Sequence, residues 1–314
     1  MKELHTFAIC AYQDSPYLEA CIRSAVGQSH PTKVILCTST PSPYIQGLAD
    51  QYGIPVFVRD GESGIQEDWN FAYEKADSRY VTIAHQDDMY GRNYVKTLVK
   101  YVNKFDDINV FTTDYVTVRE HRLEPCERLT MVKRVLRIPL RIPYLNHLRP
   151  VKQAALLFGN SICCPACTYH KEMLGGPLFR SSCRFALDWD TLIDLSEKPG
   201  RFICAEEPLV FHRLHQDAAT NACMKDSRRY EEEMAMFSRL WPGPVVRLLM
   251  HFYQKAYASY EAKDSREVSG SCAAPGSCAA SDFGEASESC EMPGSGAKAE
   301  PCGEAEMGTK YGEE

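Results

Sequence analysis

Residues 80–88 read YVTIAHQDD, an apolar run that ends abruptly in two adjacent carboxylates, Asp87 and Asp88. A short, β-branched apolar run is typical of a strand buried in a sheet. In open α/β sheets, ligands bind in the crevice beyond the carboxyl ends of the strands, where these two acids would lie. The alternative is that Asp87 and Asp88 cap a helix that begins near Arg92, because Asp is a preferred N-cap residue.

The first hundred residues alternate between strand and helix patterns, which favours βαβ units and a parallel sheet. The expected strands are 6–11, 33–37, 56–58 and 80–84, and the expected helices are 16–26, 45–52, 66–76 and 94–105. Further strands are expected at 110–113, 115–118, 160–167, 201–205 and 209–212, with helices at 185–196 and 227–260. We therefore predict an α/β fold with a mostly parallel central sheet flanked by helices.

The charge of the chain is concentrated at its end. The whole sequence has 42 acidic and 35 basic residues, of which twelve acidic and four basic residues lie in 261–314, leaving 30 and 31 in the body. Residues 1–260 are therefore nearly neutral, and this charge balance does not favour binding to nucleic acid. The last segment is rich in Ser, Gly, Ala and Glu and has few large apolar residues, so we expect a disordered acidic tail.

The beginning of the chain, 1–9, is interpreted as a first strand and not as a secretory signal, because its apolar run is short and no cleavage site follows. The 14 cysteines are accordingly expected to be reduced. Cys164 and Cys167 form a C-x-x-C pair, but a zinc site would need a second pair, so we interpret them as small buried residues. These features favour a cytoplasmic protein, with peripheral contact at the inner face of a membrane as an extension of that prediction.

A basic segment supports that extension. Seven Lys and Arg residues occur in 128–152 without one acid: Arg128, Lys133, Arg134, Arg137, Arg141, Arg149 and Lys152. Two interpretations stay open. The segment is either a solvated connector or an insert that faces phosphates or anionic lipid.

Four segments in sequence order, over roughly residues 4–220, resemble glycosyltransferase family 2, the inverting nucleotide-sugar transferases. The first is 7–14 with Leu18, Ser24 and Gln28-Ser29, similar to the family's opening strand and following helix. The second is 64–70 with Ala72 and Ala76, similar to the element that covers the donor. The third, 85–88, is similar to the D-x-D region, and the fourth comprises 188–190, 208–209 and 212–215, similar to the acceptor-side acid and the R-x-H motif.

The resemblance implies a GT-A fold, with a nucleotide-sugar half at 1–118 and an acceptor half at 119–220. The helical pattern that follows predicts an extension at 221–260. It implies transfer of a hexosyl or related sugar from a UDP- or dTDP-sugar to a saccharide or lipid-linked acceptor, in polysaccharide or glycolipid synthesis. The donor-binding residues implied are Ala11, Tyr12, Asp14, Thr38, Gly64, Trp69, Asn70, Gln86, Asp87 and Arg213.

The same resemblance implies a site for Mn²⁺ or Mg²⁺, held by Asp88 together with Asp87 and His215. It makes Asp188 the base that takes the acceptor proton, with Asp190 as second candidate. At a helix N-terminus, Asp188 is expected to have a pKa lowered by the helix dipole.

Two departures from the family pattern are visible. Thr38-Ser39-Thr40 stands where the family has an acidic pair that recognises the base of the nucleotide, and His85 replaces the first acid of the D-x-D region. Two other functions fit this pattern less well. A nucleotidyltransferase would need a glycine-rich basic phosphate loop after the first strand, which 11–16 does not provide. A non-catalytic binding partner would not need Asp87, Asp88, Asp188 and His215 together.

Overall fold

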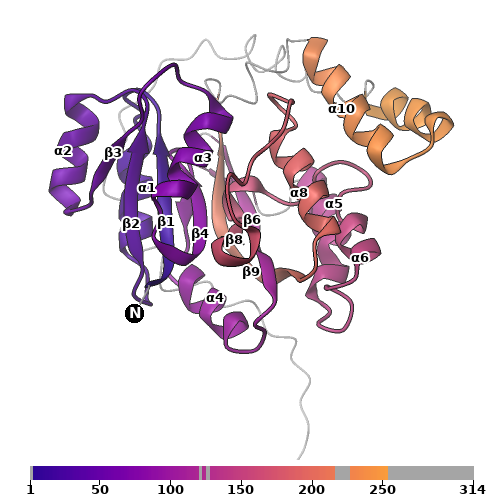
Figure 1. Ribbon diagram of the computed structural model, residues 1–314, viewed down its shortest axis with the longest axis horizontal. Helices are drawn as coiled ribbons and strands as arrows, with labels where there is room; N and C mark the ends of the chain where they lie inside the picture. Colours follow the sequence, from indigo (N-terminus) through magenta and orange to yellow (C-terminus); the bar gives the residue numbers. More distant parts are fainter. Residues whose placement is uncertain (1–2, 120–121, 125–127, 216–226, 254–314) are drawn as a thin grey trace, which may run out of the picture. The chain divides into compact units, whose positions relative to one another are not determined.

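The computed structural model describes residues 3–119, 122–124, 128–215 and 227–253 (Figure 1). The predicted tail at 261–314 lies outside the described residues. Within the described part, no helix is long and apolar enough to cross a membrane.

The strands form one mixed sheet in the order β3-β2-β1-β4-β8-β6-β9-β5, with β7 paired to β6. The strands are β1 (Glu3–Ala11), β2 (Lys33–Thr38), β3 (Val56–Val58), β4 (Ser78–His85), β5 (Met89–Tyr90), β6 (Ile108–Arg119), β7 (Arg122–Glu124), β8 (Thr168–His170) and β9 (Arg201–Leu214). Strands β1 to β4 pair in parallel, as the sequence predicts. Strand β8 is antiparallel to both β4 and β6, so it joins the parallel half to the rest of the sheet.

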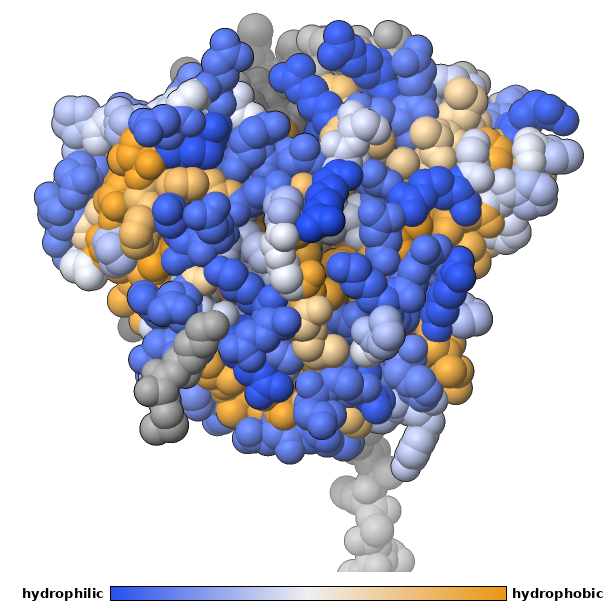
Figure 2. Space-filling view, in the orientation of Figure 1, coloured by the Kyte–Doolittle hydropathy of each residue, from blue (hydrophilic) through white to orange (hydrophobic). Residues whose placement is uncertain are grey.

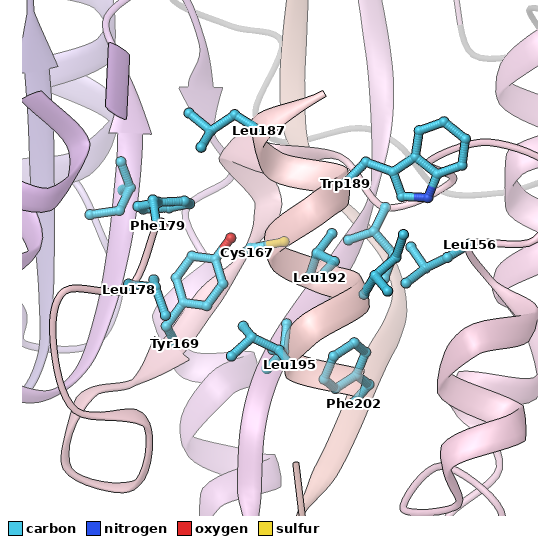
Figure 3. Close-up of a cluster of buried hydrophobic side chains, with 14 of the residues drawn as sticks. Leu156, Cys167, Tyr169, Leu178, Phe179, Leu187, Trp189, Leu192, Leu195 and Phe202 are labelled. Carbon is cyan, nitrogen blue, oxygen red and sulfur yellow. The ribbon is translucent and has the colours of Figure 1, made fainter. Parts of the chain in front are cut away.

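Helices cover both faces of the sheet. They are α1 (Leu18–Val26), α2 (Pro43–Tyr52), α3 (Ile65–Lys75), α4 (Tyr94–Val102), α5 (Arg128–Arg137), α6 (Arg149–Ala154), α7 (Lys171–Leu174), α8 (Leu187–Glu197) and α10 (Ser227–Leu240), with 3-10 turns η1 (Ile138–Arg141) and η2 (Cys164–Ala166). Successive residues of β1 point to opposite faces: Phe7 and Ile9 pack with α1, α2 and α4, whereas Ala8 packs with α3 and α8. Figure 3 shows the second of these cores, in which Leu187, Leu192 and Leu195 of α8 gather near Tyr169 and Phe202.

Several predicted elements differ from the observed ones. The two strands expected at 110–113 and 115–118 are one strand, β6, whose register against β9 shifts on both sides of Asp114. That irregularity lies opposite Pro208 and interrupts the alternation of side chains between the two faces of the sheet. One strand therefore resembles two in the sequence. The strand expected at 160–167 is wrong: the segment is loop and 3-10 turn, because Pro165 has no N–H to donate to a ladder. The long helix expected at 227–260 is interrupted at Trp241-Pro242.

The basic segment is folded into the protein, so the solvated connector is wrong. The buried Asp114 carboxylate accepts a hydrogen bond from Arg137, forms an ion pair with Arg134 and lies 3.7 Å from Arg141. The Arg137 side chain is fully buried and also donates to the carbonyl of Ser161. Farther along, buried Lys152 donates from Nζ to two backbone carbonyls, and burial lowers its pKa to about 8. These charges are therefore structural.

A buried histidine makes the fold sensitive to acid. His5 lies between Thr32 and Thr82, at 2.7 and 2.8 Å, and burial lowers its pKa from 6.5 to about 3. Between these values the unfolded chain binds a proton that the folded protein does not, so stability decreases as the pH falls through this window. We expect this difference in His5 protonation to lower the free energy of unfolding by about 2 kcal/mol at about pH 5. In urea unfolding measured at several pH values, the free energy of unfolding should decrease less steeply with falling pH for His5→Gln than for the natural protein. Equal slopes would contradict the prediction.

Candidate active site

Strand β4 ends in a turn that places Asp88 inside the protein. Its side chain is 1% exposed, and Oδ1 accepts from Nδ1 of His212 at 3.0 Å and from the backbone N–H of Arg213 at 2.8 Å. Burial acts to raise the Asp88 pKa, but His212 and the backbone N–H outweigh it and hold the pKa below its ordinary value. Neither acid caps the next helix, because the N-cap position of α4 is Asn93. Asp88 thus ties the end of β4 to β9.

Asp87 points to the other side of the turn. Its Oδ2 lies 3.1 Å from Nε2 of His215, and Nε of Arg213 donates to its backbone carbonyl at 3.1 Å. The Arg213 guanidinium lies 4.4 Å above the ring of Tyr17, which also contacts the His215 ring at 4.9 Å. Arg213 and His215 therefore share one face of the strand end, as their alternation in the sequence predicts.

This arrangement has the chemistry of a partial metal site. Carboxylate and imidazole are ligands that Mn²⁺ accepts, and Mg²⁺ is commonly held by one or two carboxylates plus the phosphates of a substrate. No group of three or more Asp, Glu, His or Cys in the described residues could hold a metal. The two facing side chains, Asp87 and His215, fit a cation whose remaining ligands come from a diphosphate and water. The sequence leaves open which of the two acids is the main ligand; in the structure, Asp88 is already bound to protein groups at Oδ1.

The loop after β1 is fixed against this turn. The Gln86 side chain accepts from the backbone N–H of Tyr12 at 2.8 Å and donates to its carbonyl at 3.0 Å. This pair presents the Tyr12 ring, 48% exposed, at the carboxyl end of the sheet. Next to it, Ala11 is the register partner of Thr38, and Asp14 accepts from Ser42, the N-cap of α2. The donor-binding residues predicted on β1 and β2 thus lie side by side.

Helix α3 supplies a second wall. It begins at its N-cap Gly64, and its Trp69 ring stacks on His85 with centroids 4.8 Å apart. Burial lowers the pKa of His85, so the ring is neutral against Trp69. Asn70 differs from the other predicted donor contacts, because its amide both donates to and accepts from the backbone of Phe179, at 2.8 and 2.9 Å. Asn70 therefore braces the loop before α8.

Sequence reasoning missed an acid on this wall. The Asp68 carboxylate accepts from Nε of Arg59 at 2.7 Å and from the Ser39 hydroxyl at 3.0 Å. It places a negative charge beside Thr38-Ser39-Thr40, where the sequence alone supplies only hydroxyls. The pairing of residues 29 positions apart leaves no local signal, although Asp68 does lie inside the 64–70 segment that the resemblance singled out.

Asp188, the predicted base, lies in the first turn of α8. Its Oδ2 accepts from Nδ2 of Asn160 at 2.7 Å, and its Oδ1 accepts from the N–H of Trp189 at 2.8 Å. The helix N-cap is Ala186, so Asp188 is no cap. Burial raises the Asp188 pKa above its ordinary value, so the lowering that we expected from the helix dipole is wrong. A carboxylate with a raised pKa is a stronger base.

The second candidate, Asp190, is engaged elsewhere. It accepts from the Ser181 hydroxyl and forms an ion pair with Arg239 of α10. Trp189 is buried and packs edge-on against Phe237, so it belongs to the core and not to a sugar-binding surface. Of the acids in 188–190, Asp188 is the one whose described partners include no cation at ion-pair distance.

The two acidic centres share electrostatic neighbours. Asp188 and Asp88 both raise the pKa of the buried Cys164 thiol, in addition to the larger effect of burial. Lys133 of α5 lowers the pKa of Asp188 and also that of His212. Lys133 therefore lies close enough to interact electrostatically with Asp188 and with His212, which binds Asp88.

Comparison with known families identifies the family of this chain. The model of glycosyltransferase family 2 matches residues 6–174, just over half of the chain. The chain belongs to glycosyltransferase family 2. No curated protein sequence matches it with significant similarity.

Solved structures share the GT-A fold of this family 2 chain at low sequence identity. TarS 1–349 of S. aureus, in complex with UDP-GlcNAc, has a TM-score of 0.55 at 13% identity over 74% of this chain and 65% of that one. Mannosyltransferase PcManGT from Pyrobaculum calidifontis, in complex with GDP-Man and Mn²⁺, has a TM-score of 0.55 at 14% identity, covering 87% and 77%. Glucosyl-3-phosphoglycerate synthase from Mycobacterium tuberculosis has a TM-score of 0.51 at 14% identity, covering 76% and 80%. The chain spans just under two thirds of TarS 1–349 and 39% of the longer TarS structure.

Proposed function

We propose that this family 2 protein is a metal-dependent inverting glycosyltransferase that moves a sugar from a nucleoside diphosphate to an acceptor hydroxyl. The observation that carries the proposal is the pairing of Asp87 with His215 at the carboxyl end of the sheet, together with the base candidate Asp188 in the first turn of α8. PcManGT is described with GDP-Man and Mn²⁺, and TarS with UDP-GlcNAc, which supports a nucleotide-sugar donor and a divalent cation for this chain too.

The donor is proposed to lie along the ends of β1, β2 and β4. The exposed ring of Tyr12 offers a stacking surface for a base, and Asp68 with Ser39 offers hydrogen-bond acceptors at its edge. A carboxylate that accepts a hydrogen bond suits the ring N–H of uracil or thymine, so we propose a UDP- or dTDP-sugar. Arg213, whose guanidinium is fixed over Tyr17, would contact the diphosphate.

The reaction is a single displacement at the anomeric carbon. The acceptor oxygen forms a bond to that carbon as its proton passes to Asp188, and the bond from the carbon to the diphosphate oxygen breaks, releasing the nucleoside diphosphate. A cation bound at Asp87 and His215 would act as a Lewis acid that stabilises the charge on the leaving diphosphate. Asn160 would hold the carboxylate of Asp188 in place, and its raised pKa suits proton removal.

The acceptor is proposed to be a saccharide or a lipid-linked saccharide of polysaccharide or glycolipid synthesis, used at the cytoplasmic side of a membrane. Titration calorimetry with UDP tests the donor half of the proposal. We expect UDP to bind with Mn²⁺ and to bind at least about ten-fold more weakly with a chelator, since metal ligation contributes to affinity. Equal affinity in both conditions would refute metal dependence, and hydrolysis of a panel of nucleotide sugars would identify the donor.

A further inference from the structure

Helix α5 is amphipathic in the opposite sense to that of a typical surface helix. On such a helix, apolar side chains face the core and charged ones face water. In α5, Arg137 is fully buried and Arg134 reaches the buried Asp114, whereas Val132 and Val135 are 58% and 61% exposed. The cations are directed inward, and the apolar side chains are directed outward.

The exposed face continues beyond the helix. Eight of the exposed large apolar side chains of the described protein lie within 18 consecutive residues, and we call them the apolar ridge: Met131, Val132, Val135, Ile138, Ile142, Tyr144, Leu145 and Leu148. Their first four positions follow helical spacing, so they share one face of α5 and η1. Figure 2 shows apolar surface at the right-hand edge of the molecule, over α5 and α6. Apolar surface gathered in this way marks an interaction site.

A basic and aromatic hollow adjoins the end of the ridge. Its volume is about 310 Å³, and it is lined by Lys104, Phe105, Pro143, Tyr144, His147 and Arg201. Tyr144 belongs to both features and is 86% exposed. Arg201 is paired with Asp107 at 2.5 Å, whereas Lys104 and His147 have no acid partner among the residues that the structure describes.

We propose that the apolar ridge lies in the surface of an anionic lipid bilayer, with a phosphate head group in the hollow beside it. Helices that lie in the membrane interface bury an apolar face at the acyl boundary and keep cations at the head groups. An exposed Tyr at the border between them is typical of the interfacial aromatic belt. The exposed cation of Lys104 in the hollow beside the ridge favours an anionic surface over a second copy of the chain.

The location of the ridge gives this contact a role. Arg137 of the same helix donates to the carbonyl of Ser161, next to Asn160, which donates to Asp188, so α5 lies beside the candidate base. A bilayer held by the ridge would present a lipid-linked acceptor there. That consequence rests on the proposed transferase function, whereas the membrane contact itself does not.

Vesicle flotation of the full chain tests the contact. We expect binding to vesicles of phosphatidylcholine with phosphatidylglycerol, and weaker binding to phosphatidylcholine alone. Val132→Ser/Val135→Ser should weaken partitioning about ten-fold, because two exposed apolar side chains are lost. The matched control is Val26→Ser/Val58→Ser, which alters valines of 45% and 49% exposure elsewhere and should bind as the natural protein does.

The charge arm uses Lys104→Gln, with Lys96→Gln on α4 as control. Removing one cation near the surface should reduce the preference for anionic vesicles about five-fold, and only for Lys104. The proposal is overturned if the natural protein does not float, or if the ridge variant floats equally well. It is also overturned if light scattering shows a dimer that the ridge variant breaks while neither binds vesicles. Manganese-dependent UDP binding, measured in parallel, would be unaffected in each case, so the two proposals fail separately.

Discussion

Replacing Asp188 with Asn is expected to reduce turnover by about 10²- to 10⁴-fold, the range associated with loss of a general base. Asn keeps the shape of the side chain and can still contact Asn160, but it cannot accept the acceptor proton. Because Asp188 lies on α8 and the proposed nucleotide contacts lie on the strand ends, UDP affinity in the presence of Mn²⁺ should remain unchanged. Steady-state kinetics and calorimetry on the same preparation would measure both.

The matched control is Asp194→Asn, on the same helix. Asp194 is exposed and pairs with Arg239, so its loss should leave the rate near normal. The pH profile adds a readout that a purely structural role would not change. The base must be deprotonated, and burial raises the Asp188 pKa, so kcat/KM should fall with decreasing pH above the ordinary carboxyl range. A near-normal rate for Asp188→Asn would reject the assignment.

The parallel half of the fold could be predicted from local sequence because each of its elements carries its own pattern. Strands β1 and β4 are continuous apolar runs, and the helices between them have helical periodicity, so the order of elements follows. Strand β8 could not be predicted, because three residues carry no pattern. Its place depends on pairing with β4 and with β6, each more than fifty residues earlier in the chain. Such pairings are properties of the tertiary structure.

The direction in which the basic side chains of 128–152 point could not be predicted from the sequence either. The basic segment at 128–152 has no acid of its own, so its sequence suggested solvent or a phosphate. The buried acid that pairs with α5 is Asp114 on β6, and burial of Arg137 against it directs the apolar side of α5 outward. The sequence shows how many cations the segment carries. The direction in which their side chains point depends on Asp114, which the local sequence does not reveal.

The sequence also does not reveal the separate roles of the adjacent acids Asp87 and Asp88. These roles lead to the second prediction with a large expected effect. Two neighbouring residues in a turn point in different directions, and the sequence does not say which one faces the ligand. In the structure, Asp88 is buried against His212 and the N–H of Arg213, residues 124 and 125 positions away. Asp87 faces His215. The two acids should therefore differ in the property that each substitution affects.

Asp87→Asn is expected to weaken manganese-dependent UDP binding by about 100-fold or more, since changes even in the outer shell of a metal site cost 10- to 100-fold. Its stability should be almost unchanged, because Asp87 is partly exposed. Asp88→Asn should instead lower the free energy of unfolding by about 1–3 kcal/mol, the range for disturbing a buried, charge-assisted hydrogen bond. The folded Asp88→Asn protein should bind UDP with an affinity closer to that of the natural protein than Asp87→Asn does.

Urea unfolding and calorimetry on both variants separate these outcomes. His215→Ala serves as the third arm, because it removes the imidazole that faces Asp87 and should reproduce the binding defect of Asp87→Asn. If Asp88→Asn abolishes binding while Asp87→Asn retains it, the cation is held from the buried side of the turn and the arrangement described here is reversed. If neither substitution alters manganese dependence, the facing pair of Asp87 and His215 is an ordinary hydrogen bond that closes the end of β9, and the diphosphate must be stabilised by Arg213 alone.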